Sequence, residues 1–249
     1  MHRRRQQITE LVNTTGRTSL NRLAEHFGVS VQTIRNDVRE LVQQGLILRN
    51  HGEVLPFPHR ENISYDQRRI HNSAGKARIA DLCAQQLGSF QTLFLGTGST
   101  VAALAARLSH LQGLKVLTNN LHVVHQLGDH PDCRLAIAGG RVRQRDQDVI
   151  GGDALRFFQR YQADTAITSV GAMNTSGQLF DYNDDEVMAR EAMLEQSRFH
   201  VLLLDSSKFD GYAACHAGRI EDYDLVVTDT PLPTGIHARL MARGREVLN

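Results

Sequence analysis

The chain has 249 residues, of which 41% are hydrophobic and 22% are charged, and its formal net charge at pH 7 is +1. This composition is typical of a globular protein of one or two domains, and it excludes a low-complexity or fibrous chain. No apolar run approaches the roughly 18 residues of a membrane span, and the basic N-terminus lacks the apolar core of a signal peptide, so we expect a cytoplasmic protein.

Basic charge is concentrated at the start of the chain. Residues 1–60 contain nine arginines and five acidic residues, whereas the rest of the chain contains 19 basic and 22 acidic residues. A basic head on a slightly acidic body is typical of a module that binds a polyanion and is joined to a second domain.

Two helices are predicted first. Apolar residues at helical spacing indicate a helix over residues 4–12, which Gly16 ends. A second apolar stripe predicts a helix over residues 20–27, and the hydroxyl of Thr18 or Ser19 can cap its start.

A third helix is predicted over residues 31–44, after a turn at Gly28 and a capping hydroxyl at Ser30. Two helices joined by a short turn that contains glycine are typical of a helix-turn-helix. The face that the apolar residues of the third helix leave exposed carries side chains that pair with base edges or phosphates, namely Gln32, Thr33, Arg35, Asn36 and Arg39. This helix, with Ser30 at its start, is therefore the predicted recognition helix for the major groove of double-stranded DNA. The alternative is a solvated polar face, but such a face usually carries lysine, and this one has none.

A hairpin is predicted over residues 45–55, where two short β-like runs flank a polar turn. Arg49 and His51 near its tip are candidates for contact with the DNA backbone or the minor groove. A hairpin after the third helix completes a winged helix-turn-helix over residues 3–58.

These residues resemble the DeoR family of bacterial repressors. The string from Ser30 to Val38, SVQTIRNDV, is similar to the recognition helix of that family, and GLILRNHG is similar to its wing. Two residues depart from the pattern. Many members have a second arginine where this chain has Asn36, which bears on the operator sequence, and a glycine where it has Glu53, which weakens the attraction of the wing for phosphate.

The stretch over residues 59–75 breaks both periodicities and follows two prolines, so we expect a linker there. From residue 76 to residue 249, helical patterns alternate with short apolar strands, which predicts an α/β domain with a mainly parallel sheet covered on both faces. The predicted strands cover residues 92–95, 115–117, 134–138, 165–170, 201–204, 225–228 and 246–248. The helices predicted before or after them cover residues 76–87, 100–108, 121–127, 154–161 and 185–197.

Polar and small residues follow nearly every predicted strand, at the edge where ligands bind in open α/β sheets. The strongest such loop is Gly96-Thr97-Gly98-Ser99-Thr100, where glycines expose backbone N–H groups and hydroxyls add donors for an anion. It matches neither the Walker A pattern nor the dinucleotide pattern, and it suits a small phosphate monoester. A glycine turn that serves packing alone is the alternative.

Further candidates for the same ligand end the other strands, and they are Asn119, Asn120, Gly139, Gly140, Arg141 and Lys208. Amide and cationic side chains can bind hydroxyls and phosphate oxygens, although loop residues of these types are often simply solvated. Asp181, Asp184, Asp185 and Glu186 precede a helix, where negative charge favours the helix start; hydroxyl recognition is the second interpretation.

The body also resembles the DeoR family. GTGST is similar to the phosphate loop of its sensor domain and of ribose-5-phosphate isomerase, and TNNL, AGG, IGG and DSSKF are similar to the repressors. The resemblance implies an isomerase-like fold, a phosphorylated sugar-like effector, and a homodimer or homotetramer whose affinity for DNA falls when the effector binds. It also implies repression of a carbohydrate-metabolism operon.

The main alternative is an isomerase with an added DNA-binding head. Isomerases carry Asp-Gly-Ala-Asp after a strand, but residues 170–173 are Val-Gly-Ala-Met, so both acids are absent, although Glu191 is a possible substitute. His122 and His125 lack a third metal ligand, so no metal is expected, and no cofactor is expected either. An RNA-binding protein is disfavoured because the chain has no tryptophan and no lysine patch. The three cysteines, Cys83, Cys133 and Cys215, are far apart and are expected to be buried thiols.

Overall fold

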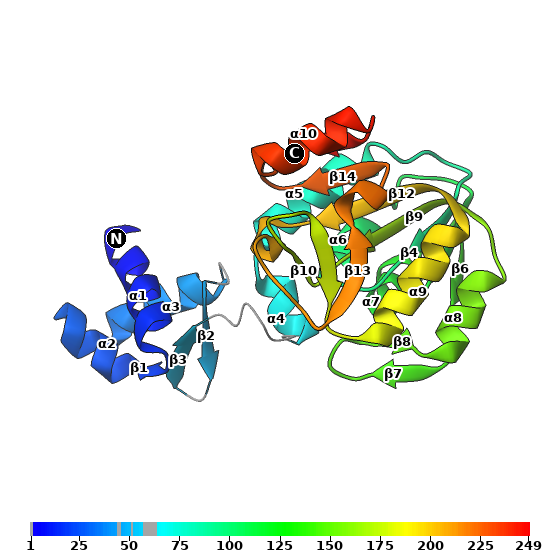
Figure 1. The fold of residues 1–249 in the computed structure, drawn as a ribbon. Helices are drawn as coiled ribbons and strands as arrows, with labels where there is room; N and C mark the ends of the chain where they lie inside the picture. The colour runs from blue at the N-terminus through cyan, green and yellow to red at the C-terminus, as the bar shows by residue number, and fades with distance from the viewer. Residues whose placement is uncertain (1, 44–45, 51, 57–63) are drawn as a thin grey trace. The chain divides into compact units, whose positions relative to one another are not determined.

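The computed structural model describes residues 2–43, 46–50, 52–56 and 64–249. The chain divides into two compact units, Met1–His59 with Asp66–Ser73, and Arg60–Tyr65 with Ala74–Asn249 (Figure 1). None of the helices in the described ranges combines the length and the apolar character that crossing a bilayer requires.

The first unit contains a three-helix core with a small antiparallel sheet. Its helices and strands are α1 (His2–Thr15), β1 (Thr18–Ser19), α2 (Leu20–Phe27), α3 (Val31–Gln43), β2 (Ile47–Asn50) and β3 (Glu53–Pro56), and the strand order is β1-β3-β2. The three predicted helices and the hairpin wing are confirmed, whereas β1, which pairs with β3, was not predicted. Residue 44, the predicted end of the third helix, lies outside the described residues.

The apolar positions of the helical pattern form the core of this unit. All its core side chains are at most 6% exposed, and they are Ile8, Val12, Leu20, Leu23, Ala24, Ile34, Val38, Leu41, Ile47 and Val54. Because α3 buries Ile34 and Val38 against the other helices, its opposite face is turned to solvent.

The second unit is built on a seven-stranded parallel sheet in the order β15-β14-β12-β9-β4-β5-β6. The strands are β4 (Thr92–Leu95), β5 (Leu114–Thr118), β6 (Cys133–Ile137), β9 (Ala163–Ser169), β12 (Ser197–Leu204), β14 (Leu225–Thr228) and β15 (Glu246–Leu248). All seven predicted strands are present, so the predicted α/β class is confirmed.

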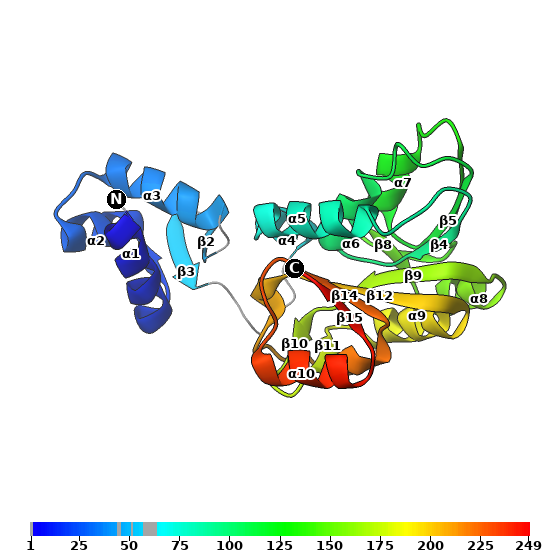
Figure 2. The same cartoon turned by 90° about the horizontal axis from the view of Figure 1, so that it is seen from above.

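Helices cover both faces of this sheet (Figure 2). On one face lie α5 (Ser73–Ala84), α6 (Ser99–Ala105) and α7 (Leu121–Leu127), and on the other lie α8 (Gly152–Gln159), α9 (Asp184–Glu195) and α10 (Thr234–Ala242).

Successive residues of a strand point to opposite faces of the sheet and pack into different hydrophobic cores. This explains why the predicted strands are apolar without interruption. Leu93 and Leu95 join the cluster that includes α5 to α7, whereas Phe94 between them packs with Phe158 of α8 and Met193 of α9.

The second unit contains elements that the sequence analysis did not predict. A hairpin of β7 (Arg141–Arg143) and β8 (Asp148–Ile150) follows β6, and β10 (Ala172–Met173), β11 (Gln178–Asp181) and β13 (Cys215–Arg219) form a small antiparallel sheet. Two 3-10 turns, η1 (Ser206–Lys208) and η2 (Ile220–Asp222), flank β13.

The predicted linker also differs from the expectation. The helix α4 (Tyr65–Ile70) and the first residues of α5 lie within residues 59–75, so the described part of this stretch is largely helical. Tyr65 is only 5% exposed, and this burial among residues distant in sequence is what the local pattern does not reveal.

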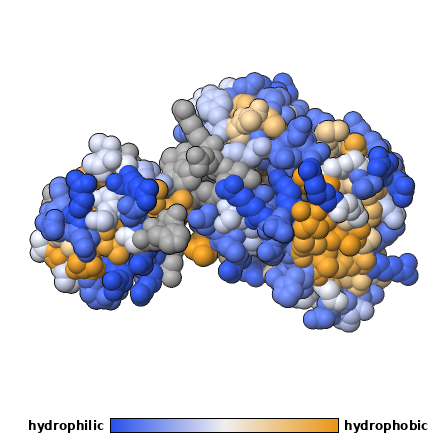
Figure 3. Space-filling view, turned by 90° about the horizontal axis from the view of Figure 1, so that it is seen from below, coloured by the Kyte–Doolittle hydropathy of each residue, from blue (hydrophilic) through white to orange (hydrophobic). Residues whose placement is uncertain are grey.

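The surface of the second unit carries a continuous apolar area in the view of Figure 3. Several large apolar side chains of this unit are exposed, and they include Phe90, Ile137, Val142, Met188 and Phe199. Cys83 is buried as expected, and burial raises its pKa to about 12, whereas Cys133 and Cys215 are only half-buried.

Candidate functional site

Local capping fixes the helix-turn-helix. Ser19 caps α2 by accepting a hydrogen bond from the N–H of Arg22, and Gly28 ends α2 in the left-handed conformation with φ of 60°. The hydroxyl of Ser30 accepts a hydrogen bond of 3.1 Å from the N–H of Thr33 at the start of α3. These residues cap the two helices at the positions that the sequence predicts.

The exposed face of α3 presents the predicted base-reading side chains. Gln32, Arg35, Asn36 and Arg39 are exposed, and Thr33 is half-exposed. Arg35 Nη1 donates to Gln32 Oε1 (3.0 Å), and Gln32 Nε2 donates to Asn36 Oδ1 (3.4 Å). The three side chains therefore form one linked polar row on an α-helix, the element that the major groove of DNA admits.

Two arginines of α1 stabilise the fold rather than project into solvent. Arg4 and Arg5 donate to the two carboxylate oxygens of Asp37, which is 2% exposed, over 2.7 and 3.0 Å. Burial alone would raise the pKa of Asp37, but the two guanidinium groups outweigh it and lower this pKa. The positive charge of α1 is thus partly used to hold α3 in place.

The wing carries one exposed cation and one neutralised anion. Arg49 on β2 is exposed, as a phosphate contact requires, whereas the predicted contact His51 lies outside the described residues. Glu53 on β3 forms an ion pair with Arg17, so its charge is balanced within the unit. The expected weakening of phosphate attraction by Glu53 is accordingly smaller than the sequence implies.

The predicted phosphate loop lies at the carboxyl end of β4 and opens α6. Gly98 caps α6 with φ of 102° and offers no side chain to the first N–H groups of the helix. A Cβ atom at Gly98 would lie 2.5 Å from Ser169 Oγ, so the loop requires glycine there. Ser99 and Thr100 follow at the start of the helix and are buried.

Asn120 holds this loop in shape. Its Nδ2 donates to the carbonyl oxygens of Gly96 and Gly98, each over 3.1 Å, and its Oδ1 accepts from the N–H of His122 (3.0 Å). Because these bonds occupy both ends of the amide, Asn120 positions the loop instead of facing a ligand.

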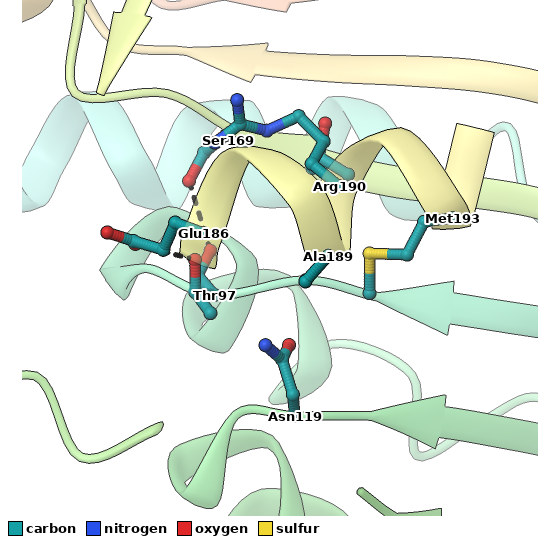
Figure 4. Close-up of a pocket in the computed structure, with 9 residues that line it drawn as sticks. Thr97, Asn119, Ser169, Glu186, Ala189, Arg190 and Met193 are labelled. Carbon is teal, nitrogen blue, oxygen red and sulfur yellow. Dashed lines mark hydrogen bonds between the residues drawn. The ribbon is translucent and has the colours of Figure 1, made fainter. Parts of the chain in front are cut away.

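A small pocket of about 210 Å³ opens beside the loop (Figure 4). Its lining comes from the ends of β4, β5 and β9 and from one side of α9, and consists of Gly96, Thr97, Asn119, Thr168, Ser169, Glu186, Ala189, Arg190 and Met193. It therefore lies at the sheet edge where the sequence places the effector, and it includes the predicted residues Gly96, Thr97 and Asn119.

A buried charge network supports one wall of the pocket. Thr97 Oγ1 donates to Glu186 Oε1 (3.0 Å), and Glu186 Oε2 pairs with Arg143 of β7 (2.9 Å). Arg143 also binds Asp148 and lies 3.6 Å from Asp146. Burial raises the pKa of Asp148 despite the pairing with Arg143. The hairpin β7–β8 is thus tied to the predicted phosphate loop through Glu186.

Two polar atoms on the lining side chains have no hydrogen-bond partner in the described part of the chain. Arg190 is 5% exposed and pairs with Asp181 through Nη2, but its Nη1 is buried and unpaired. Asn119 is 1% exposed and donates from Nδ2 to Val149 O (3.0 Å), while its Oδ1 is buried and unpaired.

The other predicted effector residues are not among the residues that line this pocket. Gly139 and Gly140 are exposed, and Arg141 is exposed and pairs with Asp185 (2.9 Å). Lys208 ends a 3-10 turn beside Asp205, which forms a buried ion pair with Lys76.

Sequence reasoning missed Ser169 and Arg190 and interpreted Glu186 as charge at a helix start. Arg190 follows Val187 and Ala189 and precedes Met193, so it lies among the buried residues of α9. An arginine in an otherwise apolar helix surface is the signal that would have identified it. Among the described residues, no three His, Cys, Asp or Glu side chains are placed to hold a metal ion.

The chain matches two family models, the DeoR-like helix-turn-helix domain over residues 4–55 and the DeoR C terminal sensor domain over residues 71–230. It is 37% identical to the glycerol-3-phosphate regulon repressor of Escherichia coli (strain K12), over 92% of this chain and 91% of that protein. It is 30% identical to the HTH-type transcriptional repressor CsqR of the same organism, over 98% of this chain and 94% of that protein. Among solved structures it is similar to ribose 5-phosphate isomerase A of Methanocaldococcus jannaschii, with 16% identity, a TM-score of 0.41 and 55% of each chain covered.

The relatives that match nearly the whole chain are named repressors, so the isomerase alternative is rejected in favour of a regulator without enzymatic activity. The helix-turn-helix match coincides with the unit that presents the polar face of α3, and the sensor match includes all residues that line the pocket. The chain belongs to the DeoR family of DNA-binding transcription regulators.

Proposed function

We propose that this protein represses transcription of a carbohydrate-metabolism operon and that a small phosphorylated metabolite releases it from its operator. The proposal assigns DNA to the first unit and the metabolite to the loop and pocket of the second. Such a regulator acts in the cytoplasm, where its operator lies.

The linked polar row of Gln32, Arg35 and Asn36 supports specific recognition of DNA. Amide and guanidinium groups form paired hydrogen bonds with adenine and guanine edges. Arg49 on the wing would contact the phosphate backbone, which contributes affinity without sequence preference.

The geometry of the loop at Gly98 is the observation that carries the effector proposal. A glycine with φ of 102° leaves the first N–H groups of α6 without a capping side chain, and Gly96 and Thr97 of the same loop line a pocket. Backbone N–H groups that face a cavity bind phosphate oxygens well, because they donate without bringing in a bulky side chain.

We further propose that the protein acts as a homodimer or homotetramer. The apolar area on the second unit supports this, because a monomer seldom leaves such an area in water (Figure 3). Two copies would present two recognition helices to a repeated or palindromic operator. Light scattering coupled to size-exclusion chromatography measures the assembly directly, and a monomer at micromolar concentration would refute this part.

Gel-shift titration at fixed salt tests the main proposal. An operator is first selected by the full chain from a library of DNA fragments, and phosphate esters of three to six carbons are then titrated into the complex. We expect one ester class to release the DNA. If no fragment is retarded, the DNA half fails; if every ester leaves the affinity unchanged, the effector half fails.

A further inference from the structure

Two buried atoms of opposite hydrogen-bonding character belong to side chains of one pocket. Arg190 Nη1 can only donate and Asn119 Oδ1 can only accept, and neither has a partner among the described residues. In the view of Figure 4, Arg190 projects from α9 on one side of Thr97, and Asn119 lies at the end of β5 on the other. Burying polar atoms without partners costs free energy, which a bound ligand would recover.

The orientation of the Asn119 amide is fixed by its surroundings. Its Nδ2 donates to the carbonyl oxygen of Val149, and its own backbone oxygen accepts from the N–H of Val149. A flipped amide would bring two oxygens together at Val149, so Oδ1 is the free end. The ligand atom that meets Asn119 must therefore carry a hydrogen.

The charge around the pocket favours a neutral group at this position. Asp181 already balances the charge of Arg190, and Glu186 in the lining is itself paired with Arg143. A second anion here would meet the Glu186 carboxylate without a free cation to compensate it. A hydroxyl suits either unpaired atom, because its oxygen can accept a hydrogen bond from Arg190 Nη1 and its O–H can donate one to Asn119 Oδ1.

The remaining lining and the size of the pocket restrict the carbon chain. Gly96, Ala189 and Met193 provide apolar surface, and the pocket is small, which excludes bulky carbon skeletons.

We propose that Asn119 and Arg190 determine specificity by binding hydroxyl oxygens on a short carbon chain. The effector class is then a small polyol phosphate whose phosphate lies at the loop of Gly98 and whose hydroxyls lie in the pocket. This inference rests on the proposed function, because it takes the phosphate site from there.

Calorimetric titration of the full chain with matched ester pairs tests the inference. Each pair has the same phosphate and chain length and differs only in hydroxyls: glycerol 3-phosphate and propyl phosphate, erythritol 4-phosphate and butyl phosphate, ribitol 5-phosphate and pentyl phosphate. We expect the parent protein to prefer one hydroxylated member by about tenfold to a hundredfold, the range expected for polar atoms left unpaired.

Two variants and a control isolate the two atoms. Asn119→Ala removes the acceptor, and Arg190→Lys keeps a cation beside Asp181 while removing the second donor group. Each should lower the affinity for the hydroxylated ester by a larger factor than the affinity for the alkyl ester, so that the preference falls below that of the parent. Asn174→Ala is the matched control, because Asn174 is a buried asparagine outside the pocket lining, and it should keep the parental preference.

The outcomes separate the two proposals. If esters bind without preference for hydroxyls, or if both variants keep the preference, the inference is wrong while the proposed function stands. If no ester of the panel binds, the phosphorylated effector is refuted and the inference falls with it.

Discussion

Gly98 is the residue on which the geometry of the loop depends most directly. A Cβ there would lie 2.5 Å from the Oγ of Ser169, and Ser169 cannot move freely because it donates to Thr97 O (3.2 Å). The positive φ adds backbone strain for any side chain.

We therefore predict that Gly98→Ala lowers the free energy of unfolding by about 1–3 kcal/mol. We also expect it to raise the effector concentration needed for DNA release by about tenfold or more, since about 1.4 kcal/mol of lost binding is enough. Urea unfolding and gel shift measure the two effects. Gly139→Ala is the control, because a Cβ there would meet nothing within 4 Å. Equal behaviour of the two variants would contradict the role of Gly98.

Lys76 and Asp205 form a buried ion pair in the second unit, with Nζ and Oδ2 3.2 Å apart. Burial alone would raise the pKa of Asp205, but Lys76 and Lys208, with the hydroxyl of Ser207, hold it at about 2. Since this pKa lies below the unfolded value of about 3.9, the ionised carboxylate stabilises the fold above roughly pH 4, and the contribution is lost as the pH falls towards 2.

Lys76→Met should cost about 3–5 kcal/mol at neutral pH, because it leaves Asp205 buried without this partner. The difference in the free energy of unfolding between the parent and the variant should decrease as the pH falls from about 7 to about 3. The parent then loses the stabilisation by the ion pair, and the variant protonates Asp205. Urea unfolding at several pH values measures this. Lys115→Met is the control; Lys115 is exposed and lies over Tyr161, so about 1 kcal/mol or less is expected. A deficit that does not change with pH would rule out the ion pair as its source.

At the scale of elements, sequence patterns were most reliable where a cap or an apolar run is local. The bounds of α2, α7, β4, β14 and β15 agree with the expectations, because Ser19, Asn120 and the flanking polar turns mark them in the sequence. Strands such as β7 and β11 were missed because they are short and partly polar, and their pairing depends on residues distant in the chain.

The candidate site was predictable to a similar degree. The loop from Gly96 to Thr100 and Asn119 follow strands, so their common position follows from the parallel sheet. Ser169 is the last residue of β9 and lies at the same edge, whereas Arg190 enters the site only through the packing of α9 beside the strand ends. That arrangement is a tertiary property, which no local pattern encodes.

The recognition helix and the wing should contribute differently to DNA binding. Arg35 lies in the linked polar row of α3, whereas Arg49 projects from β2 of the wing. We predict that Arg35→Ala costs about 1–3 kcal/mol on the operator and relaxes the preference at one base pair. Arg49→Ala should weaken binding to all sequences alike and lower the salt slope by about one.

Fluorescence anisotropy with operator variants at several salt concentrations measures both effects. Arg156→Ala is the control, because Arg156 is an exposed arginine of the second unit that pairs with Asp153. The assignment of α3 as the recognition helix fails if Arg35→Ala weakens specific and nonspecific DNA equally.

At the scale of the whole molecule, Tyr65 occupies the point where the chain passes between the two units. The division of the chain falls directly after it, and its ring stacks on His122 with centroids 3.4 Å apart. Its N–H donates to the carbonyl oxygen of Arg145 in the β7–β8 turn (3.0 Å).

These two contacts connect Tyr65 to the predicted phosphate loop. The N–H of His122 donates to Asn120, which holds the carbonyls of Gly96 and Gly98. The turn of Arg145 is connected through Arg143 and Glu186 to the hydroxyl of Thr97. A change in the loop on effector binding would therefore reach Tyr65 by two routes, through His122 and through the β7–β8 turn.

We accordingly predict that Tyr65→Ala uncouples the two activities without abolishing either. Operator DNA and effector should each still bind, but the factor by which the effector lowers DNA affinity should shrink towards one. By thermodynamic reciprocity, the factor by which DNA lowers effector affinity must shrink equally. Tyr65→Phe keeps the stacked ring and should retain more of the parental coupling than Tyr65→Ala, and Tyr161→Ala controls for loss of a ring elsewhere in the same unit. Four affinities are measured, those for DNA with and without effector and those for effector with and without DNA. A Tyr65→Ala protein with the parental coupling factor would show that the signal reaches the DNA-binding unit by another route.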